Sequence, residues 1–124
     1  MKKIIALTVA MFIGLWVGAQ TVNVTYHKNG NVKTTVYQSG DLTERVTYHK
    51  NGRIKEVASF LDGQPHGKWQ VYDKKERLIS EGDYIKGKKS GVWLVYNVTN
   101  KKVYQVTYKN DVKIDSREWA RTKE

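Results

Sequence analysis

Two histidines in identical surroundings are the first residues whose types and spacing could do chemistry. His27 and His49 stand in the segment Val-Thr-Tyr-His-Lys-Asn-Gly, which occupies residues 24–30 and again residues 46–52. On neighbouring β-hairpins the two rings would lie about two strand spacings, ~10 Å, apart, near enough to approach one metal ion. A stable zinc site takes roughly three or four ligands, however, and the sequence offers no third. We therefore expect two exposed histidines copied by duplication, and no metal site.

A pair of carboxylates is the next candidate. Glu81 and Asp83 are two residues apart, which puts both on one face of a β-strand. Glycoside hydrolysis needs two carboxyls set across a cleft with separated pKa values, and a single strand face does not provide that arrangement. The chain also has no cysteine, which excludes thiol nucleophiles, disulfides and cysteine–zinc sites. We expect a non-enzymatic protein with no catalytic residue and no cofactor.

Lysine is concentrated in two stretches of a strongly basic chain. The formal net charge is +10, and the clustered lysines are Lys86, Lys88, Lys89, Lys101 and Lys102. One interpretation is a soluble, well-solvated surface. The other is affinity for an anionic envelope lipid, an acidic polysaccharide or an acidic protein. The charges are interspersed rather than gathered in a long block, which favours the first interpretation. No nucleic-acid partner is expected.

These candidates belong to a repeat that accounts for most of the sequence. Tyr48, Tyr72 and Tyr96 are 24 residues apart, whereas Tyr26 precedes Tyr48 by 22. We attribute the shorter first spacing to a short turn at residues 37–41, where the next copy has a longer turn at residues 63–67. Self-similarity at such a period is typical of repeat architectures. The aromatic and glycine positions of the repeat are Tyr26, Tyr48, Phe60, Gly67, Trp69, Tyr72, Tyr84, Gly91, Trp93, Tyr96 and Tyr108.

Each copy of the repeat is predicted to be a β-hairpin, which gives an all-β, antiparallel sheet of successive hairpins. Asn29-Gly30 and Asn51-Gly52 favour tight hairpin turns, since both residue types tolerate a positive φ. The flanking runs are rich in Val, Thr, Tyr and Ile, which suit a pleated surface. Only residues 116–124 suggest a helix, with Ser116 as its cap, and a frayed tail is the alternative.

Equivalent residues of neighbouring hairpins should form rows across the sheet, because side chains at i and i+2 share a face. We expect one row with Trp69 and Trp93. The other two expected rows are Tyr26, Tyr48, Tyr72 and Tyr96, and Tyr37, Phe60, Tyr84 and Tyr108. Cross-strand aromatic pairs stabilise a sheet, so these rings are expected to be structural first. An aromatic platform for a sugar or an exposed base is the functional alternative.

The pattern Gly-x-Trp-x-x-Tyr, followed by a turn, an aromatic residue and a glycine, resembles the MORN-repeat variant family. The resemblance covers roughly residues 22–111 and is best in the copies that begin at Gly67 and Gly91. Before Gly52 the Gly-x-Trp element is absent. The resemblance implies an antiparallel sheet of hairpins and no catalytic residue. Bacterial members often carry an antitoxin label, and better-known members are associated with protein assembly and acidic phospholipids.

The amino-terminal residues have the layout of a secretory signal peptide. Lys2 and Lys3 precede an uncharged apolar run that ends in Val17-Gly18-Ala19, a small-residue cleavage pattern. We expect cleavage near Ala19, a repeat domain over residues 20–115 and a tail or short helix over residues 116–124. The cleavage pattern has no cysteine, so no lipoprotein is expected. The mature chain would be periplasmic or secreted.

These observations together predict a function of binding rather than catalysis. We expect an exported repeat protein that acts as a protein-interaction module in the bacterial envelope or exterior, through an exposed sheet face or an open sheet edge. One alternative is a binder of anionic lipid or polysaccharide through the lysine-rich turns. A further alternative is an antitoxin-type neutraliser of a partner toxin. Open sheet edges would also allow a homo-oligomer.

Overall fold

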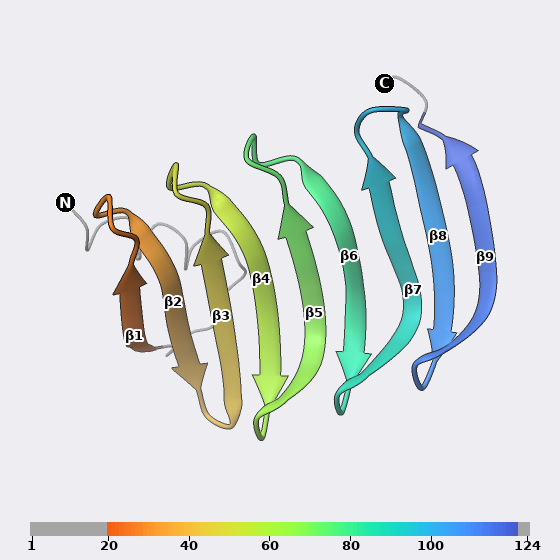
Figure 1. The fold of residues 1–124 in the computed structure, drawn as a ribbon. Coiled ribbons are helices and arrows are strands. Elements are labelled where there is room, and N and C mark those ends of the chain that lie inside the picture. Colours follow the sequence, from red (N-terminus) through yellow and green to blue (C-terminus); the bar gives the residue numbers. More distant parts are fainter. Residues whose placement is uncertain (1–19, 122–124) are drawn as a thin grey trace.

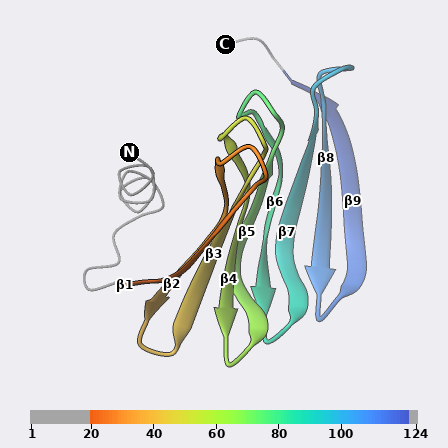
Figure 2. The same cartoon turned by 60° about the vertical axis from the view of Figure 1, so that its left-hand side comes forward.

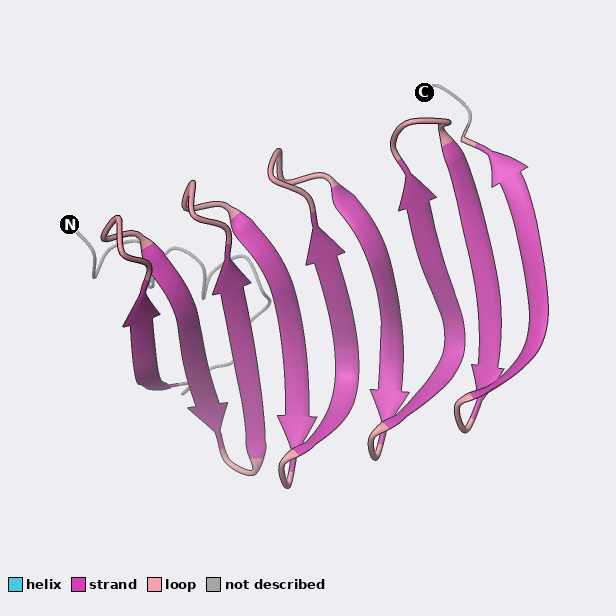
Figure 3. Ribbon diagram, in the orientation of Figure 1, coloured by secondary structure: helices cyan, strands magenta, loops and turns pink. Residues whose placement is uncertain are grey.

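The structure, a computed structural model, describes residues 20–121 and shows one antiparallel sheet of nine strands. Each strand pairs with its neighbours in the sequence, so the chain runs back and forth from one edge of the sheet to the other (Figure 1). The expected all-β fold of successive hairpins is confirmed, and Figure 3 shows no helix among the described residues. The strands are β1 (Gln20–Tyr26), β2 (Val32–Ser39), β3 (Leu42–Tyr48), β4 (Ile54–Leu61), β5 (Gln64–Tyr72), β6 (Leu78–Ile85), β7 (Lys88–Asn97), β8 (Lys102–Lys109) and β9 (Val112–Ala120).

The sheet is a single layer. Figure 2 shows it from the side, twisting from β1 to β9 with no second layer in the described part of the chain. Over residues 20–121 no helix is long and apolar enough to cross a membrane. The predicted signal peptide, residues 1–19, lies outside the described residues. The strands β1 and β9 form the two edges of the sheet.

The two faces of the sheet carry different side chains. One face, here called the core face, buries the cluster Val32, Tyr37, Val46, Tyr48 and Val57. The opposite face, here called the ring face, carries Trp69 and Trp93. The cross-strand partners and the alternation of side chains along each strand define this division. Val46 is fully buried, so the best-packed part of the molecule lies on β2, β3 and β4.

The first three turns at one end of the sheet share one backbone design. In the turns 27–31, 49–53 and 73–77, the first residue's N–H donates to the fifth residue's carbonyl, and the fourth residue's N–H donates to the first residue's carbonyl. The fourth residue takes a positive φ, +88° at Gly30, +87° at Gly52 and +60° at Glu76. The hairpins predicted at Asn29-Gly30 and Asn51-Gly52 are therefore confirmed.

The two extra residues of the longer copies lie inside strands, which corrects the expectation of a longer turn. Ala58 of β4 pairs with Trp69 of β5, and Phe60 pairs with Pro65. Two residues along β4 therefore correspond to four residues along β5. The turn itself is only residues 62–63. The same irregularity recurs between β6 and β7. Such β-bulges insert residues into one strand and bend it.

The bulges explain why the first position of the Gly-x-Trp element is glycine. Gly67 and Gly91 have φ values of +91° and +70° within β5 and β7. A residue with a side chain is strained in that conformation, whereas glycine is not. Each glycine precedes its tryptophan by two residues, so the bulge sets where Trp69 and Trp93 point.

The helix expected at residues 116–124 is wrong, and so is the frayed tail as far as Ala120. Residues 112–120 form β9, in which Trp119 pairs with Val103 and Arg117 with Gln105. A short isolated helix is marginal in water, whereas a strand at this place completes a ladder of backbone hydrogen bonds with β8. Residues 122–124 lie outside the described part.

The predicted rows are partly confirmed. Tyr26, Tyr48, Tyr72 and Tyr96 occupy equivalent places, and their partners on the following strands are Val32, Ile54, Leu78 and Val103. Tyr37 does not belong with Phe60, Tyr84 and Tyr108. It is buried on the core face opposite Glu44, whereas Phe60 pairs with Thr43 on the ring face. A shift of one residue along a strand moves a side chain to the other face.

Candidate interaction surfaces

Five aromatic rings from five consecutive strands form one continuous row on the ring face. Their centroids are 5.8 Å apart for Phe60–Trp69, 5.0 Å for Trp69–Tyr84, 5.0 Å for Tyr84–Trp93 and 6.4 Å for Trp93–Tyr108. All four contacts are edge-to-face, the arrangement that ring quadrupoles prefer. Two rows expected separately are therefore one alternating row. Each contact stabilises the sheet by roughly 0.5–1.5 kcal/mol beyond the buried area.

The centre of the row is fixed by a close approach to the backbone. The Trp93 indole lies over Gly82, where an added Cβ would meet the ring at 2.1 Å. Its Nε1–H donates to the Asp83 carbonyl oxygen at 3.1 Å. Trp93 is only 8% exposed. This tryptophan is consequently a structural residue rather than an open contact for a ligand.

Two cations accompany the row. The Arg45 guanidinium lies 4.9 Å from the Phe60 centroid and pairs with Glu56 at 3.3 Å. The Lys89 ammonium lies 4.9 Å from the Trp93 ring and 5.1 Å from the Tyr108 ring. Such contacts contribute roughly 0.5–1 kcal/mol at exposed sites. They also occupy ring surface that a sugar would need for stacking.

Strand β9 is the most open element of the described chain. It is an edge strand, and every one of its residues is exposed. Three of them are large and apolar, with exposed fractions of 62% for Val112, 60% for Ile114 and 43% for Trp119. An edge strand also presents unpaired backbone N–H and C=O groups along its outer side. This surface was not predicted from the sequence, because residues 116–124 favour a helix or a tail locally.

The charges on β9 are largely neutralised by ion pairs. Arg117 pairs with Asp115 at 3.1 Å within the strand, and Glu118 pairs with Lys102 of β8. Charged side chains are one of the devices that discourage edge strands from pairing with another chain. Here the paired charges leave the apolar side chains exposed beside an open backbone edge.

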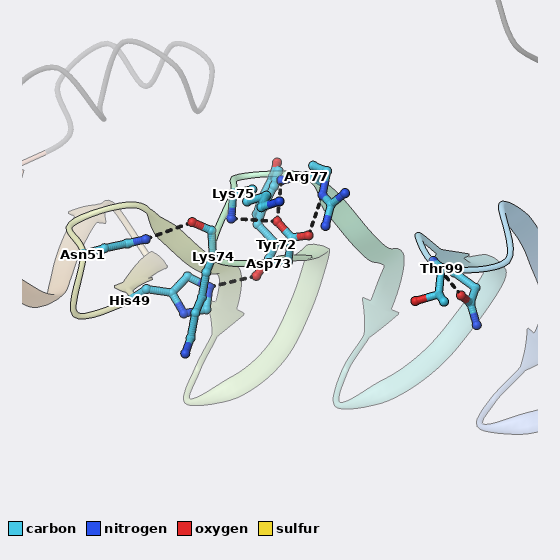
Figure 4. A network of polar contacts seen from close by, with 9 residues as sticks. His49, Asn51, Tyr72, Asp73, Lys74, Lys75, Arg77 and Thr99 are labelled. Carbon is cyan, nitrogen blue, oxygen red and sulfur yellow. Dashed lines mark hydrogen bonds and ion pairs between the residues drawn. The ribbon is translucent and has the colours of Figure 1, made fainter.

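The histidines connect neighbouring turns through hydrogen bonds to backbone carbonyl groups. His27 Nε2–H donates to the Tyr48 carbonyl oxygen at 2.9 Å. His49 Nε2–H donates to the Tyr72 carbonyl oxygen at 3.0 Å, as Figure 4 shows. Both are partly buried rather than exposed. His66, at the other end of the sheet, accepts a hydrogen bond from the Lys86 N–H at 3.2 Å. Over the described residues, no group of three or more potential ligands could hold a metal ion.

Two asparagines, each two residues after one of these histidines, also connect neighbouring turns. Asn29 Nδ2 donates to the Lys50 carbonyl oxygen at 2.8 Å, and Asn51 Nδ2 donates to the Lys74 carbonyl oxygen at 2.9 Å. Each turn is thus tied to the next through the side chains of the duplicated His-Lys-Asn-Gly segment. The duplication is therefore explained by packing between hairpins.

The third turn replaces the histidine by aspartate. Asp73 Oδ1 accepts from the N–H groups of Lys75 and Arg77, both at 2.9 Å, and Oδ2 pairs with Arg77 Nε at 2.7 Å (Figure 4). The hydrogen bond from the Arg77 backbone, followed by its guanidinium, holds the pKa of Asp73 below its usual value. This network lets Glu76 occupy the place that glycine takes in the other two turns.

The lysines singled out in the sequence lie at opposite ends of the sheet. Lys86 lies in the turn between β6 and β7, and Lys88 and Lys89 are the first residues of β7 (Figure 1). Lys101 lies in the turn between β7 and β8, at the opposite end of the sheet. Lys89 lies against two rings, and Lys102 pairs with Glu118. The five lysines therefore do not form one patch.

Glu81 and Asp83 share one strand face, as predicted, and this is the core face. Their surroundings are not those of an acid–base pair. Glu81 accepts hydrogen bonds from Tyr96 Oη at 3.2 Å and from Gln70 Nε2 at 3.4 Å. Asp83 is exposed. No opposing carboxyl across a cleft accompanies them in the described residues.

Glu44 is a buried carboxylate that was not predicted from the sequence. It lies on the core face of β3 between Tyr37 and Ser59 and is buried. Burial raises its pKa from the ordinary 4.5 to about 7. None of the ion pairs between described residues involves Glu44. Glu44 lies two residues before Val46, so the alternation of side chains along β3 places both on the same face. This spacing could have identified Glu44 as buried.

Comparisons with known proteins establish the fold alone. No protein-family model matches the chain, and no curated protein matches it. Crystal structures of the protein TarM share the fold with a TM-score of 0.50 at 12% sequence identity, one of them a mutant of S. aureus TarM in complex with Fondaparinux, alpha-GlcNAc-glycerol and UDP. The match covers 90% of this chain and 23% of TarM.

Proposed function

We propose that this chain is an exported, non-catalytic protein-interaction module, and that its partner adds an extended segment to the β9 edge. The observation that supports this is the edge itself, a nine-residue strand exposed along its whole length and carrying three large apolar side chains. Strand addition to an open edge supplies backbone hydrogen bonds for affinity, and alternate side chains supply specificity. The resemblance to MORN-variant repeats agrees with an assembly role.

The ring row is the less suitable contact surface of the two. Its central indole is buried and its cations already cover neighbouring rings. The rings therefore stabilise a sheet that has no second layer among residues 20–121, while β9 has exposed apolar area that these contacts do not cover. Export is supported by the charge, length and cleavage pattern of residues 1–19.

The test is capture of partners from the envelope fraction of the source cells by two matched double variants. In Ile114→Lys/Trp119→Lys, two positive charges replace apolar side chains of the edge. In Val92→Lys/Val95→Lys, the same two charges replace side chains of β7 that are 48% and 44% exposed within the sheet. Thermal unfolding checks that both variants fold.

The proposal predicts that a partner held by the wild type and by the β7 variant is lost by the β9 variant. If the partner is a second copy of the chain, self-association in solution follows the same pattern. A partner retained equally by both variants contradicts the edge as the contact. Binding only to acidic-lipid vesicles, lost steeply with added salt, would favour the anionic-surface alternative.

A further inference from the structure

A hollow beside the first hairpin turn is lined by three lysines that form no ion pair with another described residue. It has a volume of about 400 Å³ and is lined by Tyr26, His27, Lys28, Asn29, Lys33 and Lys50. Its size falls in the range of small-molecule sites, roughly 300–1,000 Å³. It lies at the β1 edge, at the other side of the sheet from β9.

None of the three lysines of the hollow forms an ion pair with a carboxylate of the described residues. The ion pairs between described residues involve Arg45, Arg77, Lys102 and Arg117 instead. Among residues 20–121, no acidic side chain lines the hollow. Ammonium groups around one opening repel one another, and a bound anion would remove that repulsion.

The backbone under the lysines is held in place. Asn29 and Asn31 both donate from Nδ2 to the Lys50 carbonyl oxygen, at 2.8 and 2.7 Å, and the Asn31 N–H donates to Asn29 Oδ1 at 3.0 Å. His27 adds its bond to the Tyr48 carbonyl oxygen. Lys28 of one turn and Lys50 of the next are therefore kept in a fixed relation, which lowers the entropic cost of binding.

The segment Tyr-His-Lys-Asn recurs in the next hairpin, but the ring of its tyrosine is buried there. There the equivalent tyrosine, Tyr48, is 2% exposed, whereas Tyr26 is 48% exposed. The difference follows from position, because Tyr26 lies on β1, the edge strand of the described sheet, whereas Tyr48 lies on β3, between β2 and β4. At the third hairpin, Asp73 introduces a carboxylate paired with Arg77.

We propose that this hollow binds a phosphate or sulfate group of a small ligand, with Lys28, Lys33 and Lys50 as the anion-binding residues. Ammonium groups make short, charge-assisted hydrogen bonds to such oxyanions. The site is independent of the β9 edge and uses none of the lysines that the sequence pattern singled out.

The experiment follows the amide signals of the isotope-labelled protein by NMR during titration with three probes. These are inorganic phosphate, glucose phosphate, and phosphatidylcholine vesicles containing phosphatidylglycerol. The variant Lys28→Gln/Lys33→Gln removes two charges from the hollow. The control Lys86→Gln/Lys88→Gln removes two charges from the other end of the sheet.

We expect saturable shifts at residues 26–33 and at Lys50, with affinity at least about tenfold weaker in the hollow variant and unchanged in the control. The probe that binds most tightly identifies the source of the group as free phosphate, a sugar ester or a lipid headgroup. Equal weakening in both variants would mean attraction to net charge and would overturn the site. So would the absence of shifts at these residues with all three probes.

Discussion

At the scale of the residue, two positions set how the sheet packs on its two faces. Gly82 leaves the space that the Trp93 indole fills on the ring face. Glu44 is buried on the core face without an ion pair to another described residue. A side chain at position 82 would clash with the Trp93 ring, so replacing Gly82 should lower the stability of the protein. Burying the charge of Glu44 is unfavourable, so replacing Glu44 by a neutral residue should raise the stability.

Replacing Gly82 by alanine should destabilise the protein by roughly 1–3 kcal/mol, because the new methyl group must displace the Trp93 ring. Urea unfolding measures the change. The second substitution Trp93→Ala removes the clash, so a double-mutant cycle should show coupling between the two positions. Additive effects would mean that the indole does not lie on Gly82.

Replacing Glu44 by glutamine should stabilise the protein at pH 8 by roughly 2–3 kcal/mol and leave it unchanged at pH 4. The folded pKa, about 7, is above the ordinary 4.5, so the folded state holds the proton more tightly. Wild-type stability therefore falls as the pH rises from 4.5 to 7, and the variant lacks this fall. Urea unfolding of both proteins across this range measures it. A difference that does not vary with pH would contradict a buried carboxyl.

At the scale of the element, the sequence predicted the strands and the Asn-Gly turns, since these depend on local residue types. It could not locate the bulges, because an insertion of two residues looks the same in a turn and in a strand. It also misplaced Tyr37, whose face depends on the register of β2. Ser116 and Glu118 favoured a helix locally, and pairing with β8 overrode that preference.

The third turn gives an element-scale prediction. Glu76→Gly should stabilise the protein by about 1 kcal/mol, because Glu76 holds a φ of +60° that costs little for glycine. The control Lys75→Gly lies one residue earlier in the same turn, outside the positive-φ residues, and should destabilise. Thermal unfolding distinguishes them. A destabilised Glu76→Gly would show that the Glu76 Oε1 contact with the Ile54 N–H outweighs the backbone strain.

At the scale of the whole molecule, a single-layer sheet has two consequences. Its stability rests on contacts between neighbouring hairpins: the ring row, the core-face cluster and the turn-to-turn hydrogen bonds of His27, His49, Asn29 and Asn51. Over the described residues both edge strands, β1 and β9, have a neighbour on one side only, and β9 is the one that carries large apolar side chains along a fully exposed strand. The repeat pattern predicted the first consequence. Open edges were predicted too, but the apolar side chains of β9 were not, because residues 116–124 were expected to form a helix or a tail.

The central claim, strand addition at β9, is tested most directly by amide hydrogen exchange of the protein with and without a captured partner. The outward-facing amides of residues 112–120 should exchange freely in the isolated protein and become protected in the complex, while those of β1 stay unchanged. Protection confined to the ring face or to the β1 edge, with β9 exchanging as before, would contradict the account.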